Sequence, residues 1–440
     1  MTPNAGVRSR LRDLTAGATR PEQQNGRPFG PTAQLVYRDP MTVVFADIQA
    51  AQGRIAGQVD RTPVRYSRRL SALTGAEVWI KYDNLHFTGS FKERGALNRL
   101  SQLSPEERRR GVVAASAGNH AQALAYHGGR LGIPVTIVMP EGTPFTKIDG
   151  TRSHGATVVI KGADFTGSTE EAHRLRDEEG FVFISAFDDE GIVTGQGVCA
   201  IEFLEDAPDL DALIIPIGGG GLIAGCSIAA KAIKPDIRIF GVEAAMYPSF
   251  TARRKSETPR CGGATIAEGI AIKAVGDIPF ALADPLVEDV LVVDEEDFEK
   301  AVALFATLEK TVAEGAGAGG LAALLRYPER FKGMKVGLVL CGGNIDARML
   351  AVVLNREMVR EKRLIVYRIL GDDRPGMLSA MAAVIGGLGG NIIDVVHNRL
   401  ALDVPAKGAE FDIMVETRDS AHSDAIGQAL KDKGYALRMG

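Results

Sequence analysis

Four consecutive glycines, Gly218–Gly221, follow the apolar run at 212–217 and precede a segment of helical character. A strand that ends in glycines and leads into a helix exposes backbone N–H groups at the helix N-terminus, where they can bind an anion such as phosphate. A tight turn would also explain a glycine run. Lys92, preceded by Ser90 and Phe91, adds the amine and the ring that a phosphorylated aldehyde cofactor needs. Together these features predict a site for such a cofactor.

Short β-branched runs alternate with helical stretches from Val43 onward. This alternation predicts an α/β fold, in which helices cover both faces of parallel sheets. The expected strands are 78–82, 112–116, 135–139, 157–160, 182–186, 212–217, 239–243 and 336–340. The expected helices are 93–102, 121–131, 144–153, 169–179, 197–205 and 222–232.

Three polar or glycine-rich segments begin where expected strands end. They are Ser116–His120, Gly218–Gly221 and Cys341–Asn344. Ligands of open parallel sheets bind beyond the carboxyl ends of the strands. We therefore expect these segments to meet at one site.

The two ends of the chain differ from this pattern. Residues 1–40 carry six arginines against three acids, with little apolar periodicity, and are expected to be a disordered extension. A catalytic domain is expected at 41–355, a polar linker at 356–363 and a second domain at 364–440. In the second domain, expected strands at 364–370, 392–398, 410–416 and 435–438 enclose expected helices at 375–388 and 421–433. That β-α-β-β-α-β order is typical of a ferredoxin-like domain.

Composition limits the function classes. The net charge of −4 gives no reason to expect nucleic acid or an anionic membrane as a partner. No stretch reaches the ~18 apolar residues that a membrane-spanning helix needs. The four cysteines are isolated from one another, so neither a zinc site nor a disulfide framework is indicated. We therefore expect a cytoplasmic protein.

The region from 82 to 346 resembles the pyridoxal-phosphate dependent threonine ammonia-lyases (threonine dehydratases) of the tryptophan-synthase-β fold type. The resemblance rests on four motifs in the family's order, which are Ser90–Ala96, Ser116–Gln122, Gly218–Leu222 and Cys341–Asp346. It implies two open, mostly parallel sheets with helices on both faces (fold type II) and pyridoxal 5′-phosphate as the cofactor. The implied reaction converts threonine to 2-oxobutanoate and ammonia, and serine to pyruvate.

The resemblance also implies roles for individual residues. Lys92 would carry the cofactor and remove the substrate's α-proton, and Phe91 would flank the cofactor. Cys341 would face the pyridine nitrogen, where many relatives have serine. The other implied cofactor contacts are Asn119, Gly218, Gly219, Gly220, Gly221, Leu222, Glu314 and Gly342. The loop that would grip the substrate carboxylate, with a catalytic role for its first member, is Ser116, Ala117, Gly118, Asn119 and His120.

Other functions stay open. A serine racemase needs a second base, and that family places a serine at the position matching Ala117. Racemase relatives also use a metal site; Glu243 is present here, but Tyr247 and Ser249 occupy its other positions, so no metal is expected. A threo-3-hydroxyaspartate dehydratase is a further alternative. An O-acetylserine-type synthase is a weaker one, because such synthases differ from this sequence in the loops that contain Lys92 and Asn119. A non-catalytic amino-acid sensor would not need Lys92.

The C-terminal part resembles an ACT domain, a module that senses amino acids. The match is the turn Asp373–Gly376 followed by Gly390–Ile392. It implies an allosteric enzyme whose effector is an amino acid, with valine or isoleucine expected first, and a homo-oligomer, either a dimer or a tetramer. A purely structural dimerisation module is the alternative. Isoleucine biosynthesis and threonine breakdown both remain open as the pathway.

Overall fold

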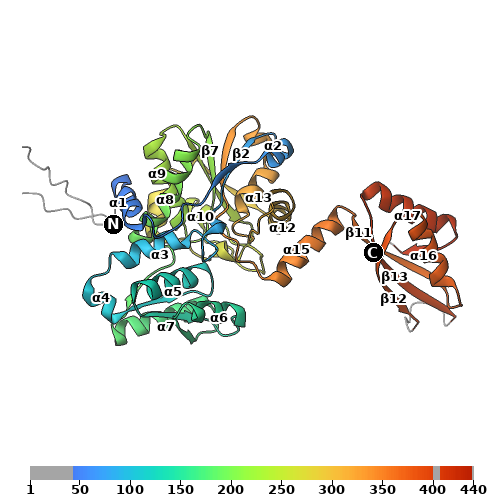
Figure 1. The fold of residues 1–440 in the computed structure, drawn as a ribbon, viewed down its shortest axis with the longest axis horizontal. Coiled ribbons are helices and arrows are strands. Elements are labelled where there is room, and N and C mark those ends of the chain that lie inside the picture. The colour runs from blue at the N-terminus through green and yellow to red at the C-terminus, as the bar shows by residue number, and fades with distance from the viewer. Residues whose placement is uncertain (1–42, 400–406, 439–440) are drawn as a thin grey trace, which may run out of the picture. The chain divides into compact units, whose positions relative to one another are not determined.

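A computed structural model of the protein describes residues 43–399 and 407–438. Two sheets lie in the part of the chain before residue 364 and a third lies after it (Figure 1). The first part alternates strands and helices, so the α/β fold class is confirmed. The extension expected at 1–40 lies outside the described residues.

The larger sheet has six strands in the order β1-β2-β10-β7-β8-β9. β1 pairs antiparallel with β2, and the other neighbours are parallel. Leu213 and Ile215 of β7 pack into one apolar core, and Ala212 and Ile214 pack into another. Successive residues of a strand point to opposite faces, so a strand covered on both sides is apolar throughout. Across the sheet, the strands are Val64–Tyr66, Glu77–Lys81, Lys335–Val339, Ala212–Pro216, Arg238–Ala244 and Asp289–Val293.

The smaller sheet has four parallel strands in the order β5-β4-β3-β6. β3 is again buried on both faces, with Val112 and Ala114 in one core and Val113 and Ala115 in another. Across the sheet, the strands are Thr157–Ile160, Val135–Met139, Val112–Ala115 and Val182–Phe183.

Helices cover both sheets. α8 (Glu190–Asp206) and α9 (Gly221–Ile233) contribute to the core on one face of the larger sheet. α3 (Lys92–Ser101) and α5 (Asn119–Leu131) lie on one face of the smaller sheet, and α7 (Phe165–Glu179) lies on the other. The remaining helices here are α1 Phe45–Ile55, α2 Arg68–Thr74, α4 Pro105–Arg110, α6 Phe145–Ser153, α10 Ser249–Arg254, α11 Asp277–Ala283, α12 Glu295–Leu304, α13 Gly319–Arg326, α14 Pro328–Phe331 and α15 Ala347–Arg360. Short turns of helix are η1 Asp83–Leu85, η2 Glu268–Ile270 and η3 Phe305–Glu309.

α8 is longer than the expected helix at 197–205, and the reason is its close contact with α3. A Cβ atom on Gly195 would lie 2.6 Å from the Cα of Gly95. Glycine disfavours a helix by about 1 kcal/mol relative to alanine, which argues for a later start. Here glycine is required because two helix backbones approach each other.

The segment expected as a linker continues α15 as far as Arg360. Arg356 and Arg360 both pair with Glu299 of α12, with 2.9 Å between Arg356 Nε and Glu299 Oε2. These contacts anchor the first part of the segment to the body that precedes it. β11 then begins at Leu364.

The third sheet is antiparallel, with strand order β12-β13-β11-β14. The order β-α-β-β-α-β expected for this part of the chain is confirmed. Ile369, Phe411 and Ile426 belong to a core that is separate from those of the first part. The strands across the sheet are Asn391–Asn398, Gly408–Glu416, Leu364–Asp372 and Ala436–Arg438, and the helices are α16 Met377–Gly387 and α17 Ser420–Asp432.

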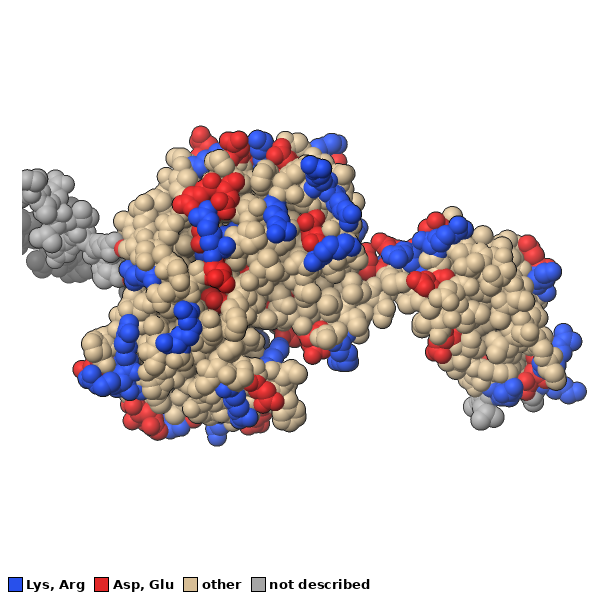
Figure 2. All heavy atoms as spheres, in the orientation of Figure 1, with Lys and Arg blue, Asp and Glu red and all other residues tan. Residues whose placement is uncertain are grey.

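Basic and acidic side chains are interspersed over the face shown in Figure 2. Among the residues that the structure describes, no helix has both the length and the apolar character needed to cross a membrane.

Candidate active site

A cavity of about 300 Å³ brings together the loops that follow β3, β7 and β10 with the start of α3. The expected meeting of the three motif segments is therefore found in the structure. The expected site residues that line the cavity are Phe91, Lys92, Ser116, Ala117, Gly118, Asn119, His120, Gly218, Gly219, Gly220, Gly221, Leu222, Glu314 and Cys341. The remaining one, Gly342, lies directly behind, since a Cβ on it would lie 2.3 Å from Glu314 Oε1.

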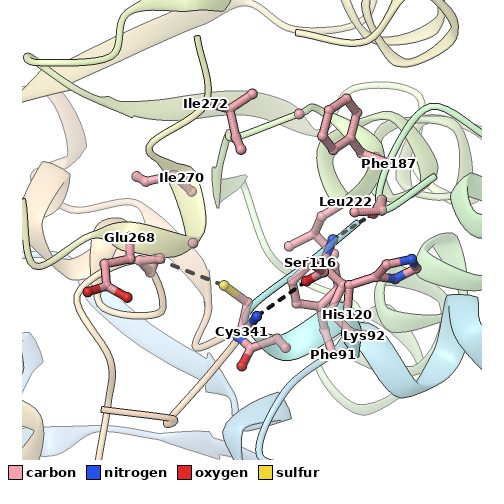
Figure 3. A pocket seen from close by; sticks show the side chains of 18 of the residues that line it. Phe91, Lys92, Ser116, His120, Phe187, Leu222, Glu268, Ile270, Ile272 and Cys341 are labelled. Atoms are coloured by element: carbon pink, nitrogen blue, oxygen red, sulfur yellow. Dashed lines mark hydrogen bonds between the residues drawn. The ribbon is translucent and has the colours of Figure 1, made fainter. Parts of the chain in front are cut away.

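Lys92 is the first residue of α3, and its amine is held in place inside the cavity (Figure 3). Its Nζ donates a hydrogen bond of 2.7 Å to the carbonyl of Ala186 and lies 5.1 Å from the centre of the Phe91 ring. Burial lowers the pKa of this amine to about 8, although Cys341 and Glu314 act to raise it. An amine with such a pKa can serve as a nucleophile or as a base near neutral pH.

The glycine segment forms a bare backbone surface at the start of α9. A Cβ on Gly219 would lie 2.0 Å from the Phe187 ring, and Gly220 has a φ of 93°, which favours glycine. The first N–H groups of a helix have no partner within that helix. The segment can therefore donate several hydrogen bonds to an anion.

Backbone hydrogen bonds join the loop before Lys92, called the lysine loop, to the loop that begins at Cys341. Phe91 N–H donates to the carbonyl of Cys341 at 3.0 Å, and Gly343 N–H donates to that of Gly89 at 2.9 Å. Burial keeps the pKa of the Cys341 thiol well above its ordinary value. Cys341 therefore remains a neutral group in the cavity.

A chain of side-chain hydrogen bonds links three loops. Asn344 Nδ2 donates to the carbonyl of Thr88 at 2.7 Å and to Asn119 Oδ1 at 2.8 Å. Asn119 Nδ2 in turn donates to Glu314 Oε1 at 2.8 Å. Burial raises the pKa of Glu314 to about 7, against the opposing effect of Asn119. Asn119 is thus fixed at both ends of its amide.

His120 is neutral in this environment. Burial lowers its pKa to about 3, and the charge of Lys92 acts in the same direction. Its Nε2 lies 3.2 Å from the carbonyl of Ile184, which can only accept, so the proton of the neutral ring sits on Nε2. Nδ1 is buried without a partner among the described residues.

A buried ionic network lies under the lysine loop. Arg94, two residues after Lys92, contacts Asp83 through Nε at 2.9 Å and Glu202 through Nη2 at 2.8 Å. Lys81 Nζ also contacts Glu202, at 2.6 Å. Burial alone would raise the pKa of Asp83, but Arg94 holds it well below its ordinary value. Two cations and two anions therefore balance one another and tie α3 to β2 and α8.

The family model described as "Pyridoxal-phosphate dependent enzyme" matches residues 55–342, which include the lysine, the glycines and Cys341. The chain belongs to this family. Its cofactor is pyridoxal phosphate, and it is an enzyme.

Individual relatives agree with this assignment. The L-threonine ammonia-lyase of Thermotoga maritima is 42% identical over 90% of this chain and 99% of its own length. The L-threo-3-hydroxyaspartate ammonia-lyase of Saccharomyces cerevisiae is 38% identical over 71% of this chain and 96% of its own. Among solved structures, maize serine racemase superposes with a TM-score of 0.67 and 32% identity, covering 72% of this chain and 99% of its own.

The residues of the cavity fit this cofactor. The N–H groups of the glycine segment can bind its phosphate, where a side chain at Gly219 would collide with Phe187. Lys92 supplies the amine, and the neutral thiol of Cys341 can hydrogen-bond to a ring nitrogen.

Sequence reasoning missed several residues of the cavity. The carbonyl of Ala186 and the ring of Phe187 carry no motif, and only the three-dimensional fold places them beside Lys92 and Gly219. Lys147 and Glu268, which also line the cavity, come from segments without a recognisable pattern. Asn344 belongs to the motif Cys341–Asp346, but the motif alone does not indicate its hydrogen bonds to Thr88 and Asn119.

Glu243 has a structural environment. Its carboxylate accepts hydrogen bonds from Phe250 N–H, Thr251 N–H and Thr251 Oγ1, at 2.6, 2.9 and 2.7 Å. These bonds use both of its oxygens at the start of α10. Within the described ranges, no group of three His, Cys, Asp or Glu residues is placed to hold a metal ion.

Proposed function

We propose that the protein is a threonine ammonia-lyase, which eliminates water from L-threonine or L-serine and releases the 2-oxo acid and ammonia. The observation that carries this most directly is the 42% identity to an L-threonine ammonia-lyase over 99% of that enzyme's length. The cavity supports it, since one amine with a pKa of about 8 lies beside an anion-binding glycine segment.

Lys92 and the loop Ser116–His120 each have a task in this reaction. Pyridoxal phosphate, when bound, supplies a ring that withdraws electrons from the substrate's α-carbon. Lys92 Nζ removes the proton from that carbon, and its lowered pKa leaves a useful fraction of the amine unprotonated near neutral pH. The loop Ser116–His120 binds the substrate carboxylate at the start of α5, where the first N–H groups have no partner within the helix. The β-hydroxyl takes up a proton and leaves as water. The released enamine tautomerises to an imine, which one water molecule hydrolyses to the 2-oxo acid and ammonia.

The test uses the full chain loaded with pyridoxal phosphate. Release of 2-oxo acid and ammonia is measured across L- and D-amino acids, and chiral chromatography follows the configuration of serine. We expect 2-oxobutanoate from L-threonine and pyruvate from L-serine. Formation of D-serine as the main product would make the protein a racemase instead. A coloured holoenzyme with no turnover on any amino acid would indicate a sensor.

For the domain organisation, we propose a catalytic domain at 41–355, a connection at 356–363 and an ACT-like regulatory domain at 364–440. The separate core around Ile369 and Phe411 supports an independent C-terminal unit. An amino acid, valine or isoleucine first, would bind near Arg374–Gly376 and Asn391–Ile392 in a homo-oligomer. Such an effector acts only through different affinities for two arrangements of the assembly.

The regulatory proposal is tested with the full-length enzyme and with a version ending at residue 363. Branched-chain amino acids should shift the threonine saturation curve of the full-length enzyme and leave the truncated one unaffected. An unchanged curve for every amino acid tried would leave only a dimerisation role for residues 364–440. Sedimentation of both forms gives the oligomeric state.

We place the enzyme in the cytoplasm, in isoleucine biosynthesis. Its cysteines, Cys199, Cys226, Cys261 and Cys341, are free thiols, which suits a reducing compartment. Rescue of an isoleucine-requiring strain that lacks threonine ammonia-lyase tests the pathway. Failure of an expressed, active enzyme to rescue growth would argue for a role in threonine breakdown.

A further inference from the structure

An ion pair spans the mouth of the cavity. Lys147 Nζ of α6 lies 2.5 Å from Oε2 of Glu268, the first residue of η2. Both residues line the cavity, and their side chains are 32% and 71% exposed, so the pair lies at the entrance. In Figure 3, Glu268 lies across the cavity from Lys92 and His120. None of the steps assigned to Lys92 or to the carboxylate-binding loop uses this pair.

The charges around the cavity are few. Of the described residues that line it, Lys92 and Lys147 are the lysines, and no arginine is among them. His120 is neutral, because burial lowers its pKa to about 3. Lys92 is committed to the cofactor and to the α-proton. Among the described residues that line the cavity, Lys147 is therefore the one cation left to form an ion pair with a second carboxylate on a substrate.

That partner is already engaged. Glu268 neutralises Lys147 and presents a negative charge at the same place. Both charges act inside the cavity, since Glu268 acts to raise the pKa of Glu314 and Lys147 acts to lower it, although burial has the larger effect. The wall that follows Glu268 is apolar and contains Ile270 and Ile272. This side of the cavity suits an uncharged substituent and disfavours an anionic one.

We propose that Glu268, through its ion pair with Lys147, selects hydroxy amino acids with an uncharged β-substituent and excludes those with a second carboxylate, such as L-threo-3-hydroxyaspartate. The inference rests on the proposed ammonia-lyase function and assigns its substrate class. Glu268 is a specificity residue, and the elimination itself stays with Lys92.

The first test compares Glu268→Gln with the wild type as full-length holoenzymes. Glutamine keeps the shape of the side chain and removes its charge, which frees Lys147. The ratio of kcat/KM for L-threo-3-hydroxyaspartate to kcat/KM for L-threonine should rise about tenfold, a moderate value because solvent screens the site. Lys147→Gln should give no rise, and the double variant should lose the gain of Glu268→Gln.

Glu257→Gln is the matched control. Glu257 is an exposed acid that does not line the cavity, so the same charge is removed from a different place. Its ratio of kcat/KM for L-threo-3-hydroxyaspartate to kcat/KM for L-threonine should equal that of the wild type. An equal rise in Glu257→Gln would show that net charge alone sets the preference, which would overturn the proposal.

A binding measurement gives a readout independent of turnover. L-aspartate and L-asparagine differ at one end by a charge, and neither carries a β-hydroxyl. Calorimetry should show that Glu268→Gln raises the binding affinity for L-aspartate about tenfold and leaves the affinity for L-asparagine unchanged. The difference should be smaller at high salt. Equal affinities in wild type and Glu268→Gln for L-aspartate would overturn the inference.

The two proposals fail in different ways. If the wild type releases no 2-oxobutanoate from threonine, the proposed function is wrong, and the aspartate comparison still decides the role of Glu268. If the wild type turns over threonine and the variant shows an unchanged ratio, only the specificity proposal is wrong.

Discussion

Asn119 Nδ2 donates a hydrogen bond to Glu314 Oε1 at 2.8 Å, and this bond joins the loop after β3 to the segment before α13. The carboxyl that accepts it is the one whose pKa burial raises to about 7. Glu314 also acts to raise the pKa of Lys92. The protonation of one acid therefore affects both the strength of the hydrogen bond to Asn119 and the charge of the amine.

Glu314 gives a prediction about stability and pH. Its folded-state pKa of about 7 lies above its usual value of 4.5, so the folded state binds the proton more tightly than the unfolded state does. The resulting stabilisation is complete below the usual pKa and is lost as the pH rises through 7. In the cofactor-free protein, the melting temperature of the wild type should therefore fall relative to that of Glu314→Gln between pH 5 and pH 8. Parallel melting curves across this range would contradict the assignment.

Replacing Lys92 with alanine should lower the rate of 2-oxo acid release by at least about a thousandfold, because it removes the amine and the base together. The visible absorbance of the bound cofactor should change at the same time. Circular dichroism provides the control for folding. A Lys92→Ala protein that kept its colour and turnover would mean that another lysine carries the cofactor.

Cys341→Ser should change kcat for threonine little, since both side chains are neutral groups that can hydrogen-bond to a ring nitrogen. Cys341→Asp should lower kcat more, because a carboxylate would stabilise the protonated form of the ring nitrogen and so change the ring's electron demand. Steady-state rates on threonine for the three proteins make the comparison. Full activity in Cys341→Asp would show that ring electronics do not limit the reaction.

Ala117→Ser should increase racemisation of L-serine relative to its elimination. Ala117 lines the cavity, and alanine can neither donate nor accept a proton. A hydroxyl there restores the group that serine racemases are expected to use as a second base. Chiral chromatography of the remaining serine measures the effect, and no gain in D-serine would assign control of that face to other residues.

Arg94→Met should destabilise the protein by about 3–5 kcal/mol, because it leaves Asp83 and Glu202 buried with Lys81 as their remaining cation. Urea unfolding at neutral pH measures this. Arg176→Met is the matched control, since Arg176 pairs with Asp177 at the surface and should cost little. Equal unfolding midpoints for the two variants would show that the buried network does not stabilise the fold.

The sequence predicts the strands and helices well where the side chains of a segment have a clear apolar pattern. The strand expected at 212–217 is β7 (Ala212–Pro216), because a strand covered on both faces has no polar interruption. The helix expected at 121–131 is α5, which begins two residues earlier at Asn119. The C-terminal strands and helices also lie within a few residues of their expected limits.

Features that depend on tertiary structure were not visible in the sequence. β1 (Val64–Tyr66) is a short, largely exposed edge strand, so its residues need no apolar pattern. The carbonyl of Ala186 holds Lys92 through a backbone atom, which every residue type has. Lys147 and Glu268 are 121 positions apart, and only the fold makes them partners.

Three consecutive residues that follow β6 (Val182–Phe183) each contact a different segment of the chain before residue 364. Ala186 accepts from Lys92 Nζ, Phe187 fills the space beside Gly219, and Asp188 accepts from the N–H of Ile278. Mutations here should therefore be epistatic. A larger residue at 219 is tolerable only with a smaller one at 187, and a one-residue deletion would misalign all three contacts together. A new activity should therefore evolve more readily through substitutions at the mouth of the cavity than through substitutions in this segment.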